Sequence, residues 1–150
     1  MPVTSIRRTT KSSITEPERA FVAPPETLLA GKRCLVLDDE FLIALDIQQI
    51  LEAAGTRSVI CAGNADDAMA AIRGGPRFDL AVLDVVLSGA TRTSTMVAAA
   101  LALQKTPFVF LTGMRGEDIH TREFPRAPVL DKPYQPPSLL DAVLRALASQ

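Results

Sequence analysis

The residues of this sequence most able to do chemistry are acids that directly follow short apolar runs. Asp38, Asp39 and Glu40 follow one such run, and Asp84 ends another. Carboxylates a few Å apart resist ionising together, so a cluster of them is unfavourable without a positive partner. Mg²⁺ prefers oxygen ligands and relieves this repulsion. If the two runs lie side by side, Asp38, Asp39 and Asp84 are therefore expected to bind Mg²⁺.

Two polar side chains stand at the corresponding points of later apolar runs. Thr112 ends the run Pro-Phe-Val-Phe-Leu-Thr, and Lys132 follows the run Ala-Pro-Val-Leu-Asp. A metal, an ammonium group and a hydroxyl beside a carboxylate suit phosphoryl transfer to that carboxylate, which is already ionised near pH 7. The metal and Lys132 would neutralise charge on the phosphoryl oxygens, and Thr112 would donate a hydrogen bond to one of them.

The segments on either side of these residues alternate between expected strands and expected helices. Apolar runs without apolar/polar alternation are the expected strands, at residues 33–38, 57–62, 79–84, 107–112 and 127–131. Apolar residues at helical spacing give the expected helices, at residues 43–54, 64–75, 93–104 and 136–149. Continuous apolar strands between helices are typical of parallel sheets covered on both faces. The sequence therefore predicts an α/β fold with a doubly wound, five-stranded parallel sheet.

In such a sheet, ligands bind where the carboxyl ends of the strands meet. The acids, Thr112 and Lys132 all follow expected strands, so they should share this edge. Glu40 is expected to complement the dipole of the following helix instead of binding the metal. Residues 113–126, between the last two strands, have a weak helical period. A fourth helix of the alternating pattern there is expected to be short or irregular.

Length and charge narrow the class of protein. The chain has 150 residues and a formal net charge of -1, which suits one domain and provides no positive field for nucleic acid or a membrane surface. Residues 1–30 are rich in Ser, Thr, Pro and Arg and are expected to form a disordered tail before one domain at 31–150. Cys34 and Cys61 lie in strand-like runs and are expected to be reduced core thiols in a cytoplasmic protein.

The order of the polar residues resembles the receiver domain of bacterial two-component response regulators. The shared pattern is an acidic pair after the first strand, Asp after the third, Thr-Gly after the fourth and Lys-Pro after the fifth. The resemblance covers residues 32–149 and implies a flavodoxin-like fold with strand order 2-1-3-4-5. It also implies that Asp84 is the phosphoacceptor, that Asp39 binds Mg²⁺ directly, and that Asp38 binds it directly or through water. The backbone carbonyl of Val86 is implied as a further metal ligand.

The same resemblance assigns roles to the other two polar positions. Thr112 would be the switch hydroxyl, Lys132 would contact the phosphoryl group, and the Lys132–Pro133 bond would be cis. The position that is usually aromatic, three residues before the lysine, is Val129. Residues 110–114, Phe-Leu-Thr-Gly-Met, are similar in part to the Phe-Ala-Thr-Gly-x-Tyr signature of a subclass of stand-alone receivers whose following helix is reduced.

The expected function is that of a signalling module and not of an enzyme. A sensor histidine kinase or a histidine phosphotransfer protein would phosphorylate Asp84, and this single-domain regulator would act by protein contact or as a phosphate sink. The net charge of -1 predicts no nucleic-acid or membrane partner, and a monomer or weak homodimer is expected. One alternative is a pseudo-receiver that is not phosphorylated and serves as a binding platform. A phosphatase of the haloacid dehalogenase type fits less well, because residues 38–40 read D-D-E instead of D-x-D and no cap-sized insertion is present.

Overall fold

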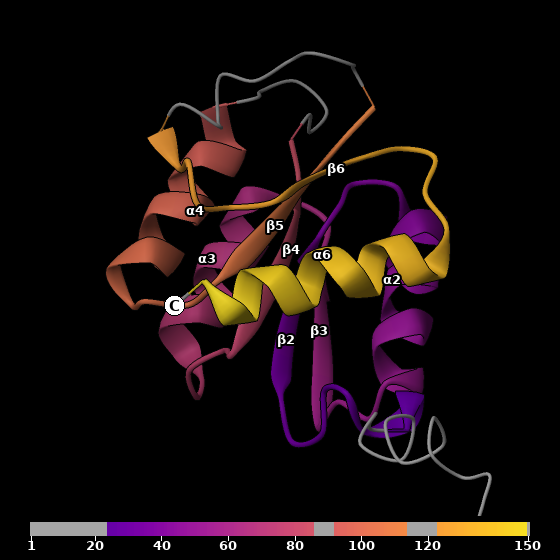
Figure 1. The fold of residues 1–150 in the computed structure, drawn as a ribbon. Helices are drawn as coiled ribbons and strands as arrows, with labels where there is room; N and C mark the ends of the chain where they lie inside the picture. Colours follow the sequence, from indigo (N-terminus) through magenta and orange to yellow (C-terminus); the bar gives the residue numbers. More distant parts are fainter. Residues whose placement is uncertain (1–23, 86–91, 114–122, 150) are drawn as a thin grey trace, which may run out of the picture.

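The computed structural model describes residues 24–85, 92–113 and 123–149 (Figure 1). The strands are β2 (Arg33–Leu37), β3 (Ser58–Ala62), β4 (Leu80–Asp84), β5 (Phe108–Thr112) and β6 (Val129–Asp131). The helices in these ranges are α2 (Phe41–Ala53), α3 (Ala65–Gly74), α4 (Arg92–Leu103) and α6 (Pro136–Ala148), with a short 3-10 helix η2 (Pro25–Thr27) before β2. The predicted strands and helices are confirmed, with ends that differ by one or two residues.

The five strands form one parallel sheet in the order β3-β2-β4-β5-β6. Counted along the chain, this is the predicted order 2-1-3-4-5 of a flavodoxin-like fold. Because β2 lies between β3 and β4, the chain reverses its direction across the sheet after β3. This reversal places the ends of β2 and β4 side by side, although about fifty residues separate them in sequence.

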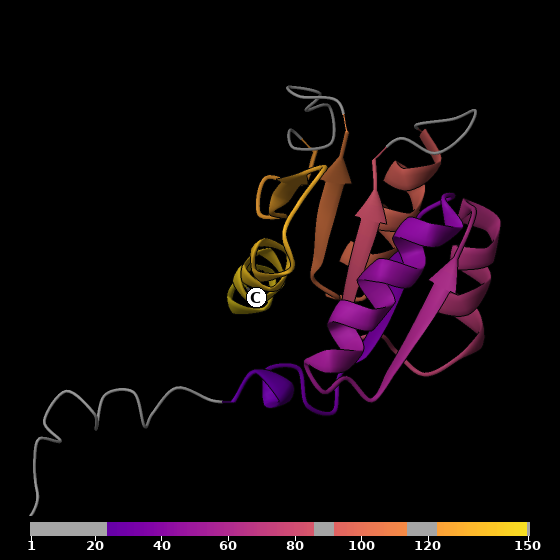
Figure 2. The same ribbon diagram turned by 90° about the vertical axis from the view of Figure 1, so that its right-hand side faces the viewer.

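Helices cover both faces of the sheet, so the fold is doubly wound as predicted. Helices α2 and α6 pack against one face and α3 and α4 against the other, and Figure 2 shows α6 and α4 on opposite sides of the strands. The three inner strands alternate their side chains between the two cores. On β2, for example, Leu35 and Leu37 enter one core while Cys34 and Val36 enter the other. This burial on both faces explains why the strands read as continuous apolar runs.

The two cysteines differ in burial, which corrects one expectation. Cys34 is fully buried on β2, whereas Cys61 is exposed on β3, and both are free thiols. β3 is an edge strand, so its side chains are covered less completely than those of the inner strands. An apolar run at the edge of a sheet therefore does not guarantee a core position.

The folded part begins earlier than residue 31. Leu29 is fully buried in the core with α2 and α6, and its N–H donates a hydrogen bond to the carbonyl of Ala54 at 2.8 Å. Gly55 has a φ of +96°, and a Cβ there would collide with the backbone oxygen of Glu26. This contact packs η2 under the end of α2, so residues 24–30 belong to the domain. Residues 1–23 of the expected tail lie outside the described residues.

The ends of the helices follow local signals in the sequence. The side chain of Asn64 accepts a hydrogen bond from the N–H of Asp67 at 2.7 Å and caps α3, which ends at Gly74. Most of the segment expected to hold a short or irregular helix, residues 114–122, lies outside the described residues. Within the described ranges, no helix has the length and apolar character needed to span a membrane.

Candidate functional site

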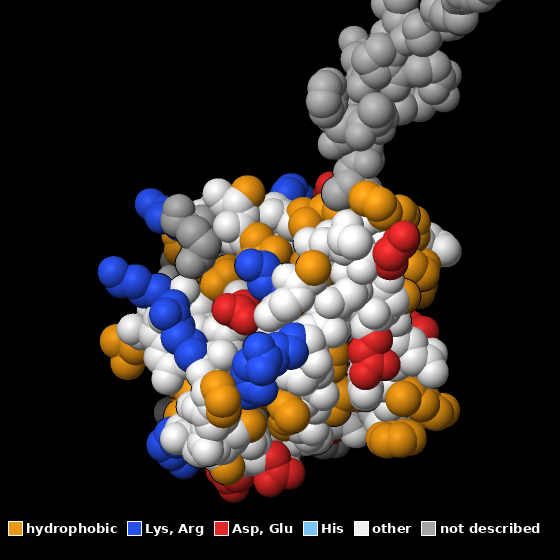
Figure 3. Space-filling view, turned by 90° about the horizontal axis from the view of Figure 1, so that it is seen from below, with side chains coloured by type: hydrophobic (Ala, Val, Ile, Leu, Met, Phe, Trp, Pro, Cys, Tyr) orange, Lys and Arg blue, Asp and Glu red, His pale blue; other side chains and the backbone are white. Residues whose placement is uncertain are grey.

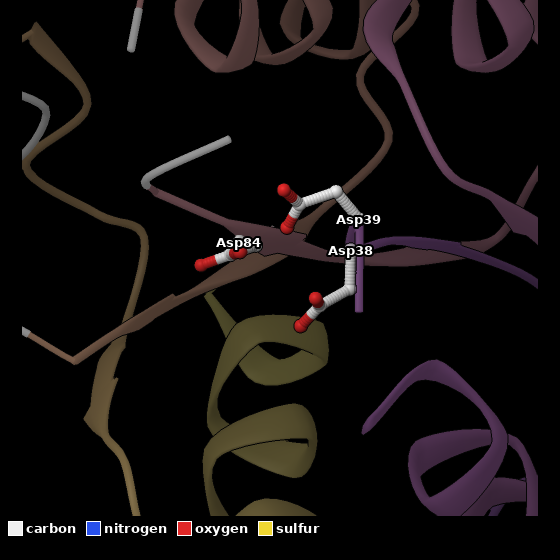
Figure 4. Close-up of side chains that lie close together, drawn as sticks. All are labelled: Asp38, Asp39 and Asp84. Carbon is white, nitrogen blue, oxygen red and sulfur yellow. The ribbon is translucent and has the colours of Figure 1, made fainter. Parts of the chain in front are cut away.

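Four adjacent strands bring the predicted site residues to one edge of the sheet. Asp38 directly follows β2, Asp84 ends β4, Thr112 ends β5, and Lys132 follows β6. Asp38, Asp39 and Asp84 each offer a carboxylate oxygen, and these oxygens lie within 4.8 Å of one another (Figure 4). The structure therefore assembles the predicted acidic cluster at the carboxyl end of the sheet.

The three carboxylates differ in exposure. Asp38 is only 2% exposed and Asp84 4%, whereas Asp39 is exposed. The backbone N–H of Asp38 donates to the carbonyl of Ala62, and its carboxylate accepts a 2.8 Å hydrogen bond from the N–H of Glu40. These bonds fix the position of Asp38 where the chain turns from β2 into α2. Asp39, on the same turn, reaches the cluster from the solvent side.

Lys132 brings an ammonium group to this cluster. Its Nζ lies 3.1 Å from Oδ2 of Asp38 and 3.4 Å from Oδ1 of Asp84. Partial burial of the ammonium lowers its pKa, but the attraction of Asp84 and Asp38 outweighs this effect, so the pKa of Lys132 is raised overall. The backbone N–H of Lys132 donates to the carbonyl of Thr112 at 2.7 Å. The predicted cis bond between Lys132 and Pro133 is present.

The donor set of the cluster fits a hard divalent cation. All three acids provide carboxylate oxygens, which Mg²⁺ prefers, and two of them are almost fully buried. Lys132 pairs with the two buried carboxylates, Asp38 and Asp84, while Asp39 offers its oxygen from the exposed side. Val86, the further ligand implied by the sequence, lies outside the described residues.

Comparisons with known proteins identify the family. No protein-family model matches the chain, and no curated protein matches it in sequence. Among solved structures, a CheY-like response regulator receiver domain protein from Methanospirillum hungatei JF-1 is 26% identical, with a TM-score of 0.68 over 79% of this chain and 95% of the other. SdrG from Pseudomonas melonis Fr1, in its BeF3-activated conformation, is 36% identical, with a TM-score of 0.65 over 79% of this chain and 98% of the other. The chain belongs to the receiver domains of response regulators.

A third solved structure with this fold contains bound Mg²⁺. The response regulator TrrA from Thermotoga maritima, in complex with Mg²⁺ and BeF, is 25% identical, with a TM-score of 0.64 over 77% of this chain and 99% of that chain. The partial likeness of this receiver to the Phe-Ala-Thr-Gly-x-Tyr subclass stays a prediction.

The position that is usually aromatic in receivers lies beside a cluster of phenylalanine rings. Val129 is half-buried on β6, in register with Phe110 of β5. The centroid of the Phe110 ring lies 5.3 Å from that of Phe108, and the Phe124 ring contacts the Phe108 ring edge to face at 5.4 Å and the Phe110 ring at a tilt at 6.0 Å. Phe108 and Phe110 of β5 therefore form an aromatic cluster next to Val129, together with Phe124 from the segment before β6. The sequence analysis missed Phe124 because the region around it shows no clear period.

Two further residues near the site were not predicted from the sequence. Ser94, in the first turn of α4, is fully buried, and its hydroxyl donates to the backbone oxygen of Asp84 at 2.6 Å and lies 3.1 Å from that of Val85. Tyr134, just after the cis bond, is half-buried, and its pKa is raised to about 12 by burial and by the nearby Asp46 and Asp38. The sequence around Ser94 and Tyr134 does not predict these contacts, because each contact is made with an element distant in sequence.

Proposed function

We propose that this receiver takes a phosphoryl group onto Asp84 from a sensor histidine kinase or a histidine phosphotransfer protein. The observation that carries the proposal is the convergence of two buried carboxylates, Asp38 and Asp84, on the ammonium of Lys132. The exposed Asp39 brings a third carboxylate within 4.8 Å of the other two, and three clustered carboxylate oxygens support a site for a hard divalent cation.

Asp38, Asp39 and Asp84 would hold Mg²⁺, and the backbone carbonyl of Val86 would complete the protein ligands. The bound ion would add positive charge beside the phosphoryl oxygens, which is the contribution of divalent ions to phosphoryl transfer in general. The solved structure of TrrA with Mg²⁺ and BeF supports this choice of ion for a receiver of the same fold.

In the proposed reaction, one carboxylate oxygen of Asp84 attacks the phosphorus of a phosphohistidine. A P–O bond to Asp84 forms while the P–N bond of the donor breaks, and the electron pair of that bond stays on the imidazole nitrogen. No general base is required, because the carboxylate is already ionised near pH 7. The ammonium of Lys132, 3.4 Å from Asp84, lies close enough to pair with a phosphoryl oxygen on the product. Thr112, buried at the end of β5, would donate a hydrogen bond from its hydroxyl to another phosphoryl oxygen.

The output that we propose is contact with another protein or a phosphate-sink role, as a non-enzymatic module in the cytoplasm. The net charge of -1 provides no positive field for a nucleic-acid or membrane partner, and we propose that the protein acts as a monomer or weak homodimer. Residues 31–150 would form the receiver domain, together with the folded segment at 24–30 that packs against α2.

The intact mass after incubation with acetyl phosphate and Mg²⁺ tests the proposal. Acetyl phosphate replaces the phosphohistidine donor, and acetate leaves in place of the imidazole. We expect the wild-type protein to gain the mass of one phosphoryl group and to lose it under alkaline conditions, as an acyl phosphate does. A wild type that gains no mass from acetyl phosphate or from any phosphorylated histidine kinase, and does not bind Mg²⁺, would favour a pseudo-receiver.

A further inference from the structure

Ser94 makes an unusual attachment between a helix and the acceptor strand. It lies in the first turn of α4 and is completely buried. A serine that caps a helix accepts hydrogen bonds from N–H groups of its own first turn. The hydroxyl of Ser94 instead donates to the carbonyl of Asp84, ten residues earlier, at 2.6 Å. The same oxygen lies 3.1 Å from the carbonyl oxygen of Val85.

These contacts occur where the pairing of β4 with its neighbours ends. The register of β4 with β2 stops at Leu83, and its register with β5 stops at Asp84. One residue further, the N–H of Val85 still donates to the carbonyl of Leu111 at 2.8 Å. The hydroxyl of Ser94 attaches the backbone of Asp84 to α4 at this point, so the acceptor residue is held by a helix as well as by the sheet.

We propose that Ser94 is a positioning residue for the phosphoacceptor. By fixing the backbone of Asp84, it holds the carboxylate at its distance from Lys132 and in its place within the acidic cluster. The inference rests on the proposed function, because it concerns the same transfer to Asp84. Ser94 acts through the backbone and takes no part in the bonds that form and break. Its loss also leaves a buried carbonyl without this donor, which favours a shift of the chain toward another partner.

The position of the carboxylate matters more for phosphoryl transfer than for folding. In-line attack needs the nucleophile within a fraction of an ångström of its productive place, and a displacement of about 1 Å can reduce a rate roughly 100-fold. A hydrogen bond that holds the backbone of the nucleophile is therefore expected to affect the rate more than an equivalent bond elsewhere. The chain contains such an equivalent bond.

Thr106 provides the matched control. It is 2% exposed, and its hydroxyl donates to the backbone carbonyl of Phe78 at 3.1 Å, across the opposite end of the sheet. Like Ser94, it is a buried hydroxyl that attaches a loop or helix residue to the backbone of a distant segment. Ser94→Ala and Thr106→Val each remove one such bond, but only the first bond holds the acceptor.

The experiment measures the melting temperature and the rate of phosphorylation by acetyl phosphate, over a range of Mg²⁺ concentrations, by intact mass. We expect both variants to melt below the wild type by similar amounts. At saturating Mg²⁺, we expect Ser94→Ala to be phosphorylated roughly tenfold more slowly, and Thr106→Val to stay within about twofold of the wild type. Ser94→Thr keeps the hydroxyl and is expected to recover most of the lost rate. If Ser94→Ala does not fold, Ser94→Cys, with a weaker donor, replaces it.

Two results would overturn the inference, and they are distinguishable. If Ser94→Ala and Thr106→Val are phosphorylated equally fast while the wild type is active, Ser94 has only a structural role and the proposed function stands. If the wild type itself neither gains a phosphoryl group nor binds Mg²⁺, the proposed function fails and the role of Ser94 fails with it.

Discussion

Both ends of the parallel sheet carry charged side chains, but those at the carboxyl end include two buried carboxylates that share one ammonium, and those at the amino end contact loops. At the carboxyl end, Asp38 and Asp84 are buried and share the ammonium of Lys132. At the amino end, Lys and Arg side chains gather over one half of the surface, with apolar side chains between them (Figure 3). A cavity of about 580 Å³ lies on this side of the molecule, between the end of α4 and the end of α6.

The charged groups at the amino end hold loops in place. The backbone N–H of Arg33 donates to the carboxylate of Asp79 at 2.8 Å, and the Arg33 guanidinium donates to the carbonyl of Pro76 at 3.3 Å. The same guanidinium lies over the ring of Phe78, 5.1 Å from its centroid. Arg77 donates to the carbonyl of Lys105 at 3.2 Å. These contacts join neighbouring loops. Among the described residues, the group of three acids that could hold a metal ion lies at the carboxyl end, so convergence of carboxylates distinguishes the candidate site from the charged amino end.

The largest expected contrast comes from removing one carboxylate at each end of β4. Asp84→Asn should abolish the gain of a phosphoryl group from acetyl phosphate, because an amide is not a comparable nucleophile. Asp79 directly precedes the same strand, and the Asp79→Asn protein should still gain the phosphoryl group. Intact mass at matched protein and Mg²⁺ concentrations measures both. A gain of one phosphoryl group by Asp84→Asn would show that another residue is the acceptor.

Removing the cation at the carboxyl end should destabilise the protein in the absence of Mg²⁺. Lys132→Met leaves the buried Asp38 and Asp84 without their ammonium, which is expected to cost about 2 kcal/mol of unfolding free energy. Arg145→Gln breaks the exposed pair with Asp141 and should cost less than about 0.5 kcal/mol. Urea titrations without divalent ions measure both values. Equal losses would mean that the Lys132 pairs are no stronger than a surface pair.

Mg²⁺ should stabilise the fold through the carboxyl end alone. An ion at ten times its dissociation constant adds about 1.4 kcal/mol to the free energy of unfolding, which raises the melting temperature by about 5 °C. Asp39→Asn should remove most of this shift, because it takes away one of the clustered carboxylates. Asp79→Asn should leave the shift unchanged. Thermal melts with and without Mg²⁺ decide between these outcomes, and an equal shift in both variants would place the ion elsewhere.

The last contrast concerns stability at alkaline pH. Burial, with a smaller contribution from Asp79, raises the pKa of the Cys34 thiol from 9.0 to about 12. The unfolded thiol therefore loses its proton from about pH 9, while the folded thiol keeps it. Stability should fall as the pH rises through this range, by about 1.4 kcal/mol between pH 8 and pH 10.

The contribution of Lys132 has a different pH window. Its pKa is raised above 10.5 in the folded state, so the stability it provides is complete below pH 10.5 and is lost at higher pH, as the pH passes through the folded pKa. Urea titrations from pH 8 to pH 10 should show a smaller loss of stability in Cys34→Ala than in the wild type. The same slope in both proteins would contradict the assignment to Cys34.

The type of fold, and the edge of the sheet at which the candidate site lies, could be predicted from the sequence. Five apolar runs without alternation specify strands buried on both faces, and the intervening helical spacing requires parallel connections. Once the strands are parallel, every residue that follows a strand must appear at the same edge. Asp38, Asp84, Thr112 and Lys132 could therefore be placed together although 94 residues separate Asp38 from Lys132.

Which groups contact one another at that edge depends on the tertiary structure. Lys132 pairs with both Asp38 and Asp84, and Ser94 donates to the backbone of Asp84. Cys61 is exposed on an edge strand, contrary to the expectation of a core position. Strand order, the reach of each side chain and the packing of helices on the sheet set these contacts. They are relations between segments distant in sequence, and no local pattern of residue types encodes them.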